Sequence, residues 1–281
     1  MNGADLIDDD GEQVFTAFNN RFSNISGSIG IAFELAKNLT FKGNAGSGFR
    51  APNIAELGAN GKHEGTFRYE IGNSKLKQET SLQFDLGLTY DAKHISMGLN
   101  AYHNRIYNYI YLGNFNNETI LAPELLPVYR FVQTNADLVG GEASVDFHFI
   151  EALHFENTFA YVKGTNRANN SALPFIPAAS ISNELRFEPK IKGLKDNFIK
   201  FGLTNVFKQS RFDDFETETA GYTLIDAGIG TAVKTKNGKI NLWLNAQNLG
   251  NKLYYNHLSR YKLAGIYNPG RNISLGISVP L

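Results

Sequence analysis

The sequence predicts an all-β fold, an antiparallel transmembrane β-barrel of which this chain holds about eleven strands. Two observations support this prediction. Hydrophobic side chains alternate with small or polar ones in segment after segment of the 281 residues, and alternate residues of a strand face opposite sides of a sheet. Short and long connections between these segments also alternate, as they do in transmembrane barrels.

The end of the chain shows the alternation most clearly. Residues 239–248 and 271–281 carry hydrophobic side chains at every second position: Ile240, Leu242, Leu244 and Ala246, then Ile273, Leu275, Ile277, Val279 and Leu281. The positions between them are mostly small or polar. A wall that faces lipid on one side and a wet lumen on the other produces this combination. We therefore expect these segments to be a hairpin of the barrel wall.

The same period of two recurs upstream and leaves little room for helices. We expect the remaining strands at residues 29–35, 39–49, 82–90, 95–102, 143–149, 153–159, 181–187, 199–207 and 225–233. Many of these segments approach the length of about nine to eleven residues that a tilted membrane strand needs.

The connections fall into two groups. Short turns are expected at residues 36–38, 91–93, 150–152 and 235–239, the last of which contains the hairpin signal Asn237-Gly238. Long loops are expected at residues 50–77, 113–128, 164–177, 208–221 and 249–270, and residues 189–197 form a connection of intermediate length. Because the two groups alternate, we expect the short turns at one rim of the barrel and the long loops at the other.

Composition narrows the function classes. The formal net charge is zero, which gives no indication of a nucleic-acid partner. There is no cysteine, so disulfides and thiolate metal sites are excluded. No apolar run reaches the roughly 18 residues of a membrane-spanning helix. The 21 Phe, 13 Tyr and 27 Gly suit interfacial aromatic girdles and the crowded interior of a barrel.

Residues 1–20 show neither the basic nor the apolar region of a signal peptide. An odd number of strands would also leave unpaired sheet edges in lipid. Both observations lead us to expect that residues 1–281 are the C-terminal portion of a longer barrel, with the first strands absent.

Residues 48–57, Gly-Phe-Arg-Ala-Pro-Asn-Ile-Ala-Glu-Leu, resemble a motif of the TonB-dependent outer-membrane receptors, especially Bacteroidetes-type members. Residues 72–81, 248–258 and 270–272 are also similar to segments of that family. The motif positions are Phe49, Arg50, Ala51, Pro52, Glu56 and Leu57. The resemblance implies a barrel of about 22 strands with an N-terminal plug, which is absent here. It departs at Leu281, where the family usually ends on an aromatic residue.

The resemblance also implies a location and partners. Such a receptor lies in the outer membrane of a Gram-negative bacterium, among lipid and lipopolysaccharide, and the barrel-assembly machinery inserts it. In the full-length protein the TonB-ExbB-ExbD complex drives uptake of a small-molecule metal chelate, such as a ferric siderophore. Haem and cobalamin are other ligands of the family. No enzyme signature and no resident cofactor is expected, although a barrel hydrolase and a soluble β-sandwich remain alternatives.

Candidate ligand-binding residues are expected in the long loops, where binding residues usually lie. They are His63, Arg68, Tyr69, Tyr109, Tyr255, His257, Arg260 and Tyr261. His63 follows the motif at a position similar to the haem-ligating histidine of haem receptors, so haem held by His63 is an alternative. Residues 254–262 form a basic aromatic loop that suits an anionic chelate. We predict no catalytic residue and no metal site.

Two further groups have structural interpretations. Tyr107, Tyr109 and Tyr111 are expected in the outer aromatic girdle, although contact with a ligand at the lumen mouth is the alternative. Charged residues on the polar face of the strands are expected to form networks in the lumen rather than catalytic pairs: Glu34, Asp85, Asp146, Glu156, Glu184 and Arg186.

Overall fold

The computed structural model describes residues 2–3, 6–7, 13–15, 18–63, 65–121, 124–236 and 238–279. Asn237 of the predicted turn and Pro280 and Leu281 of the last predicted strand lie outside the described residues, as does the motif-adjacent Glu64. Near the N-terminus, β1 (Asn2–Gly3) pairs with β4 (Phe18–Asn19), and β2 (Leu6–Ile7) pairs with β3 (Gln13–Phe15).

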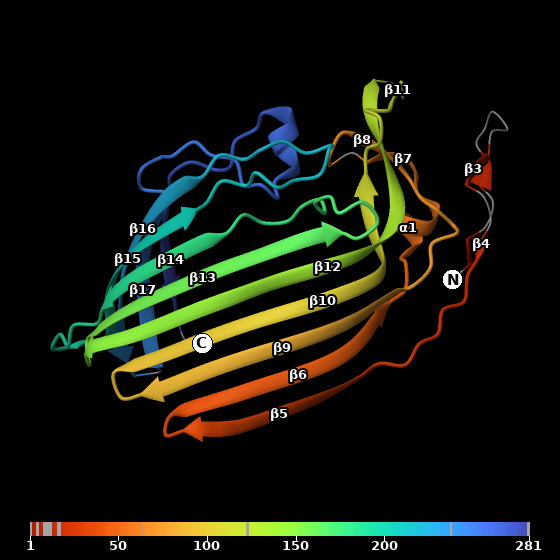
Figure 1. Cartoon of the computed structure of the whole chain (residues 1–281). Coiled ribbons are helices and arrows are strands. Elements are labelled where there is room, and N and C mark those ends of the chain that lie inside the picture. The colour runs from red at the N-terminus through yellow and green to blue at the C-terminus, as the bar shows by residue number, and fades with distance from the viewer. Residues whose placement is uncertain are drawn as a thin grey trace.

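One 14-stranded sheet dominates the described residues, and eleven of its strands form a continuous antiparallel path. In chain order the eleven are β5 (Gly27–Ala36), β6 (Leu39–Arg50), β9 (Glu79–Ala92), β10 (Ile95–Gly113), β12 (Leu125–Ile150), β13 (Leu153–Asn166), β14 (Ser180–Phe187), β15 (Leu194–Val206), β16 (Tyr222–Thr235), β17 (Gly238–Gln247) and β18 (Asn272–Ser278). Figure 1 shows this sheet curving into an open trough between β5 and β18. The predicted strand number and antiparallel order are confirmed.

The two faces of the sheet differ as alternation predicts. Large hydrophobic side chains cover the outer face without any partner layer; Ile29 is 75% exposed and Leu275 is 80% exposed. On the inner face, Lys200 pairs with Glu184 at 3.1 Å. Because so wide an apolar surface is unfavourable in water, it marks this face as the one that contacts lipid.

Several predicted lumenal charges take part in polar contacts on the inner face. Asp85 accepts hydrogen bonds from Asn44 (3.3 Å) and Gln83 (2.7 Å), and Arg186 bonds to Glu188 at 2.6 Å. Glu184 and Arg186 therefore form ion pairs as predicted, whereas Asp85 is held by two neutral amides.

Two strands are much longer than the sequence indicated. β10 continues to Gly113, and β12 begins at Leu125, inside the loop expected at residues 113–128. These extensions rise above the other strands at the long-loop end (Figure 1). The alternation is lost there because loops bury the sheet on both faces: Ile110 and Leu126 are 7% and 2% exposed.

A β-bulge in β10 overturns the predicted tyrosine girdle. The register with β12 shifts between Ile106 and Tyr109, so β10 holds one extra residue there. Asn108 supplies the left-handed backbone conformation, with a φ of 55°. Tyr107 stays on the outer face and is 44% exposed. Tyr109 is turned to the inner face, where it packs with Ile106 against a buried cluster, and Tyr111 stacks on it at 6.1 Å.

The long loops carry the remaining elements at one end of the sheet (Figure 1). They are α1 (Ile54–Gly58), β7 (Asn60–His63), β8 (Arg68–Ile71), β11 (Thr119–Leu121) and the 3₁₀ helix η1 (Arg260–Ala264). β8 pairs parallel with β12 and so ties its loop to the sheet. Within the part of the chain that is described, no helix has the length and apolar character needed to cross a membrane.

Candidate functional site

The motif at residues 49–57 builds a rigid corner where β6 ends. Arg50 donates to both carboxylate oxygens of Glu56 (2.9 and 2.8 Å) and to Glu79 (2.7 Å). Asn53 caps α1 by accepting a hydrogen bond from the Glu56 backbone amide, and Glu56 accepts one from the Asn53 amide. This reciprocal capping box, together with the guanidinium fork, holds the start of the long loop in one orientation.

Apolar residues of the same motif anchor the corner to the sheet. Pro52 is fully buried, and Leu57 joins Leu76 and Ile110 in a buried cluster. Phe49 faces outward and is 46% exposed. The motif therefore positions the first long loop, and its side chains support the site rather than form it.

The described loops meet around a cavity of about 230 Å³ at the long-loop end. Five stretches of chain line it: the loop before β8, the extension of β12, and the loops between β13 and β14, β15 and β16, and β17 and β18. The lining includes Thr66, Phe67, Arg68, Pro127, Tyr129, Phe175, Phe215, Glu216, Thr217, His257, Ser259, Arg260, Tyr261, Lys262, Leu263 and Ala264. Four predicted ligand residues, Arg68, His257, Arg260 and Tyr261, are thus brought together.

Aromatic rings and guanidinium groups alternate along the cavity wall. Arg68 lies over the ring of Tyr129 at 5.2 Å, and Arg260 lies over the ring of Phe175 at 5.5 Å. Phe215 contacts both rings, at 5.7 Å from Tyr129 and 6.1 Å from Phe175. Cation–π contacts of this kind hold a cation in place while its charge stays available to a ligand.

The three cations of the wall differ in how far they are neutralised. Arg68 is buried with Glu70, which it contacts at 2.5 Å. Lys262 donates to the Thr217 carbonyl and to the hydroxyl of Thr219 (2.6 Å) and forms no ion pair within the described ranges. Burial lowers its pKa, and the nearby carboxylates of Glu216 and Glu218 oppose that shift. Arg260 forms no ion pair with any residue of the described ranges. Arg260 and Lys262 therefore supply the positive potential of the cavity.

His257 lies at the base of this arrangement. Its Nδ1 contacts the Thr219 hydroxyl at 2.8 Å, and its Nε2 lies 3.5 Å from Glu216 Oε1. Nε2 is buried and makes no hydrogen bond to the chain as described. Burial and the nearby Lys262 lower the pKa of His257 to about 4, so the ring is neutral at pH 7. A neutral imidazole with an unmet nitrogen at a cavity wall is a candidate contact for a ligand.

Burial also favours the neutral form of two neighbouring ionisable groups. It raises the pKa of the Glu216 carboxyl, although the Asp213 and Phe175 amides donate to it. It lowers the pKa of Arg260, with Arg68 adding repulsion. Arg260 is exposed and Lys262 is half-buried, so an anionic ligand in the cavity could contact both cations.

Four predicted ligand residues do not line the cavity. His63 ends β7, is exposed and contacts the Thr66 hydroxyl at 3.1 Å. Tyr69 donates to Asn60 at 3.0 Å. Tyr109 packs on the inner face, and Tyr255 stacks on Tyr267 at 4.3 Å. His63 does not line the cavity, so the binding of haem by His63 stays a prediction.

Sequence reasoning missed the aromatic part of the wall. Tyr129 lies in the extension of β12, and Phe175 and Phe215 lie in two separate loops, so the three residues are more than thirty residues apart in the sequence. Each is a single aromatic residue in a chain that is 12% aromatic, so no local pattern distinguishes it. Only the convergence of the loops reveals these residues.

A curved antiparallel sheet with a lipid-facing outer surface, and a cavity built by long loops at one rim, defines an outer-membrane barrel receptor. Residues 4–249 match the family model described as TonB dependent receptor-like, beta-barrel. The chain therefore belongs to the TonB-dependent receptor family, whose members are receptors of the outer membrane rather than enzymes.

Relatives and solved structures agree with this assignment. An iron-regulated outer membrane virulence protein of Vibrio cholerae is 27% identical over 138 residues, which cover 47% of this chain and 21% of that protein. The copper transporter OprC superposes with a TM-score of 0.72 at 20% identity, covering 88% of this chain and 38% of OprC. The siderophore receptor PirA from Acinetobacter baumannii gives 0.63 at 20% identity, covering 90% and 40%.

At these identities the structural likeness shows the fold alone. The chain spans well under half of the length of each of these proteins.

Proposed function

We propose that the complete protein takes up an anionic metal chelate, such as a ferric siderophore, and that the loop cavity binds part of it. The observation that carries this proposal is the grouping of two cations that form no ion pair within the described ranges, Arg260 and Lys262, with the rings of Tyr129, Phe175 and Phe215. An anionic ligand with aromatic arms complements both features. The names of an iron-regulated relative and of a siderophore receptor add support.

The size of the cavity limits what it holds. A drug-sized ligand occupies roughly 300–1,000 Å³, whereas this cavity measures about 230 Å³. We therefore assign it one arm of the chelate, with the remainder of the ligand facing the lumen mouth.

The remaining steps of the proposed uptake require the whole receptor. This chain then forms the C-terminal part of a barrel of about 22 strands, whose lumen a plug fills. The TonB-ExbB-ExbD complex is the proposed source of energy for uptake, and the barrel-assembly machinery the proposed route of insertion.

Uptake of radioactive iron by cells that lack other receptors tests the proposal. A ferric tris-catecholate, which is strongly anionic, is compared with a ferric trihydroxamate, which is not. The complete receptor is expected to take up the first, and the double substitution Arg260→Ala with Lys262→Ala to reduce uptake about tenfold or more at limiting ligand. Lys208→Ala is the matched control, because Lys208 is a loop cation outside the cavity that pairs with Glu218 at 2.8 Å. Equal uptake by the double variant and the wild type would contradict the proposal.

A further inference from the structure

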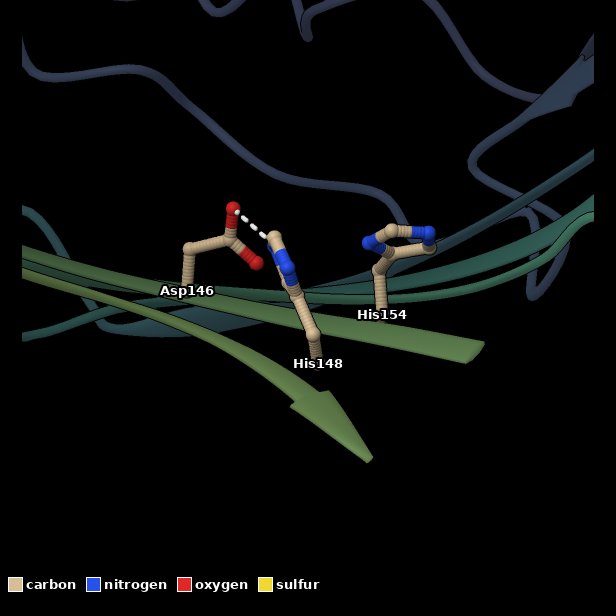
Figure 2. Close-up of side chains that lie close together, drawn as sticks. All are labelled: Asp146, His148 and His154. Carbon is tan, nitrogen blue, oxygen red and sulfur yellow. Dashed lines mark hydrogen bonds and ion pairs between the residues drawn. The ribbon is translucent and has the colours of Figure 1, made fainter. Parts of the chain in front are cut away.

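Three potential metal ligands lie together on the inner face at the opposite end of the sheet from the cavity. Asp146 and His148 are two residues apart on β12, so they share a face, and His154 is the cross-strand partner of His148 on β13. Figure 2 shows the three side chains rising from the same side of the two strands, with the imidazole of His148 between the other two groups. The short turn between β12 and β13 follows directly.

The ligand atoms of these residues all lie within 4.8 Å of one another. Around a tetrahedral Zn²⁺, donors at about 2.0 Å from the metal are roughly 3.3 Å apart. Side-chain rotation alone closes that difference, because the two imidazoles are in contact, with ring centroids 4.6 Å apart. Among the described residues, no other group of three histidine or carboxylate side chains brings its ligand atoms this close together.

The carboxylate of Asp146 is only half used. Its Oδ2 contacts His148 Nε2 at 2.9 Å. Its Oδ1 is buried and finds no hydrogen-bond partner among the described residues. An unpartnered carboxylate oxygen is costly unless something charged reaches it. A cation bound between Asp146 and the two imidazoles would satisfy it.

The neighbours of the cluster set its net charge. Glu156 lies opposite Asp146 on β13, and Ser96 lies opposite it on β10. Arg186 is the β14 partner of His154, but its guanidinium is engaged by Glu188 at 2.6 Å and lies over the ring of Phe198 at 4.4 Å. The carboxylates of Asp146 and Glu156 therefore place negative charge beside the two imidazoles.

We propose that Asp146, His148 and His154 bind a divalent transition-metal cation of the zinc class at the short-turn rim of the barrel lumen. Two imidazoles and one carboxylate suit borderline cations, and they leave a coordination position open to water or to a passing ligand. The site lies on the wall of the lumen at the end away from the loop cavity. It is independent of the chelate proposed for that cavity.

Zinc binding to the purified receptor in detergent tests the site, with a tag that contains no histidine. Isothermal titration is expected to show about one Zn²⁺ per chain with micromolar or tighter affinity. His148→Ala and His154→Ala are each expected to weaken it about tenfold to a hundredfold. His103→Ala is the matched control, because His103 also contacts a carboxylate, Asp137 at 3.2 Å, without a second histidine beside it.

A second measurement uses the wild-type receptor and therefore tests the site even if the variants fail to fold. In the wild-type receptor, Zn²⁺ is expected to protect His148 and His154 from diethylpyrocarbonate while leaving His63 reactive, as read by mass spectrometry. Protection of both supports the site. The proposal is overturned if the wild type binds no Zn²⁺, if both variants bind it as the wild type does, or if His148 and His154 react equally with and without the metal.

Discussion

The Arg50 guanidinium bridges α1 to the sheet, contacting Glu56 at 2.8 Å and Glu79 at 2.7 Å. Residue 50 ends β6 and residue 56 lies within the first turn of α1, so the contact fixes the angle at which the longest loop leaves the barrel wall. Two different nitrogens of the guanidinium hold the two carboxylates, Nη1 contacting Glu56 and Nε contacting Glu79, an arrangement that a lysine cannot reproduce.

Arg50→Lys is accordingly expected to loosen the loop without unfolding the barrel. The loss of the bridge between the Glu56 and Glu79 carboxylates is expected to cost about 1–2 kcal/mol of local stability. Amide hydrogen exchange should rise over residues 51–63 and stay unchanged in β9 and β10. Lys190→Ala, which removes an exposed ion pair with Glu151, is the control. Unchanged exchange in Arg50→Lys would show that the corner does not depend on the fork.

The lowered pKa of His257 predicts that acid reduces the stability of the loops around the cavity. Its pKa is about 4 in the folded protein against an ordinary value of 6.5. The unfolded form therefore binds the extra proton first, and stability falls as pH drops from about 6.5 to 4, by at most about 3 kcal/mol. The raised pKa of Glu216 acts in the opposite direction at the lower end of this range.

Local hydrogen exchange at the β17–β18 loop, followed from pH 7 to 4.5, measures this effect. His257→Gln separates it from Glu216, because glutamine does not titrate. Exchange in the wild type should rise with acid more steeply than in the variant. Parallel profiles would mean that His257 does not titrate against the fold.

The bulge at Asn108 predicts opposite environments for two tyrosines that are only two residues apart. The chain has no native cysteine, so single cysteines report on accessibility without background. Tyr107→Cys is expected to react with a lipid-soluble maleimide at the outer face, whereas Tyr109→Cys is expected to be shielded within its cluster. Deleting Asn108 removes the extra residue and makes the two positions neighbours in a regular strand, so the two patterns should stay as they are, because adjacent strand residues face opposite sides. Similar labelling of both cysteines would contradict the bulge.

The lipid-facing assignment is tested at adjacent residues of β17. Leu244 lies on the outer face, and Asn245 lies on the inner face, where it helps to line a polar pocket. Leu244→Arg is expected to destabilise the folded barrel by about 2–4 kcal/mol, since a cation there enters the hydrocarbon region. Asn245→Arg should cost much less because the lumen is wet. Unfolding by urea in lipid vesicles provides the comparison, and equal costs would refute the assignment.

The faces of the wall were predictable from sequence, because a strand period of two leaves a residue such as Leu244 or Ile277 only one consistent side. The bulge could not be predicted, because Tyr107-Asn108-Tyr109 reads as alternating aromatic and polar residues whether or not Asn108 is an extra residue. The contact between Phe175 and Phe215 could not be predicted either, because it depends on how two long loops fold against each other. The contact between His148 and His154 was not predictable from the short turn alone. Regular pairing outward from Ile150 and Leu153 would place Phe149 opposite His154, and a register shift between His148 and Ile150 places His148 there instead.

The central claim is that the loop cavity recognises an anionic chelate through Arg260 and Lys262. The most direct measurement is calorimetric titration of a ferric tris-catecholate into the purified receptor at two salt concentrations. We predict at least tenfold weaker binding by Arg260→Ala, unchanged binding by Lys208→Ala, and an affinity that falls as salt increases. Equal affinity in Arg260→Ala and the wild type, with no dependence on salt, would contradict the claim.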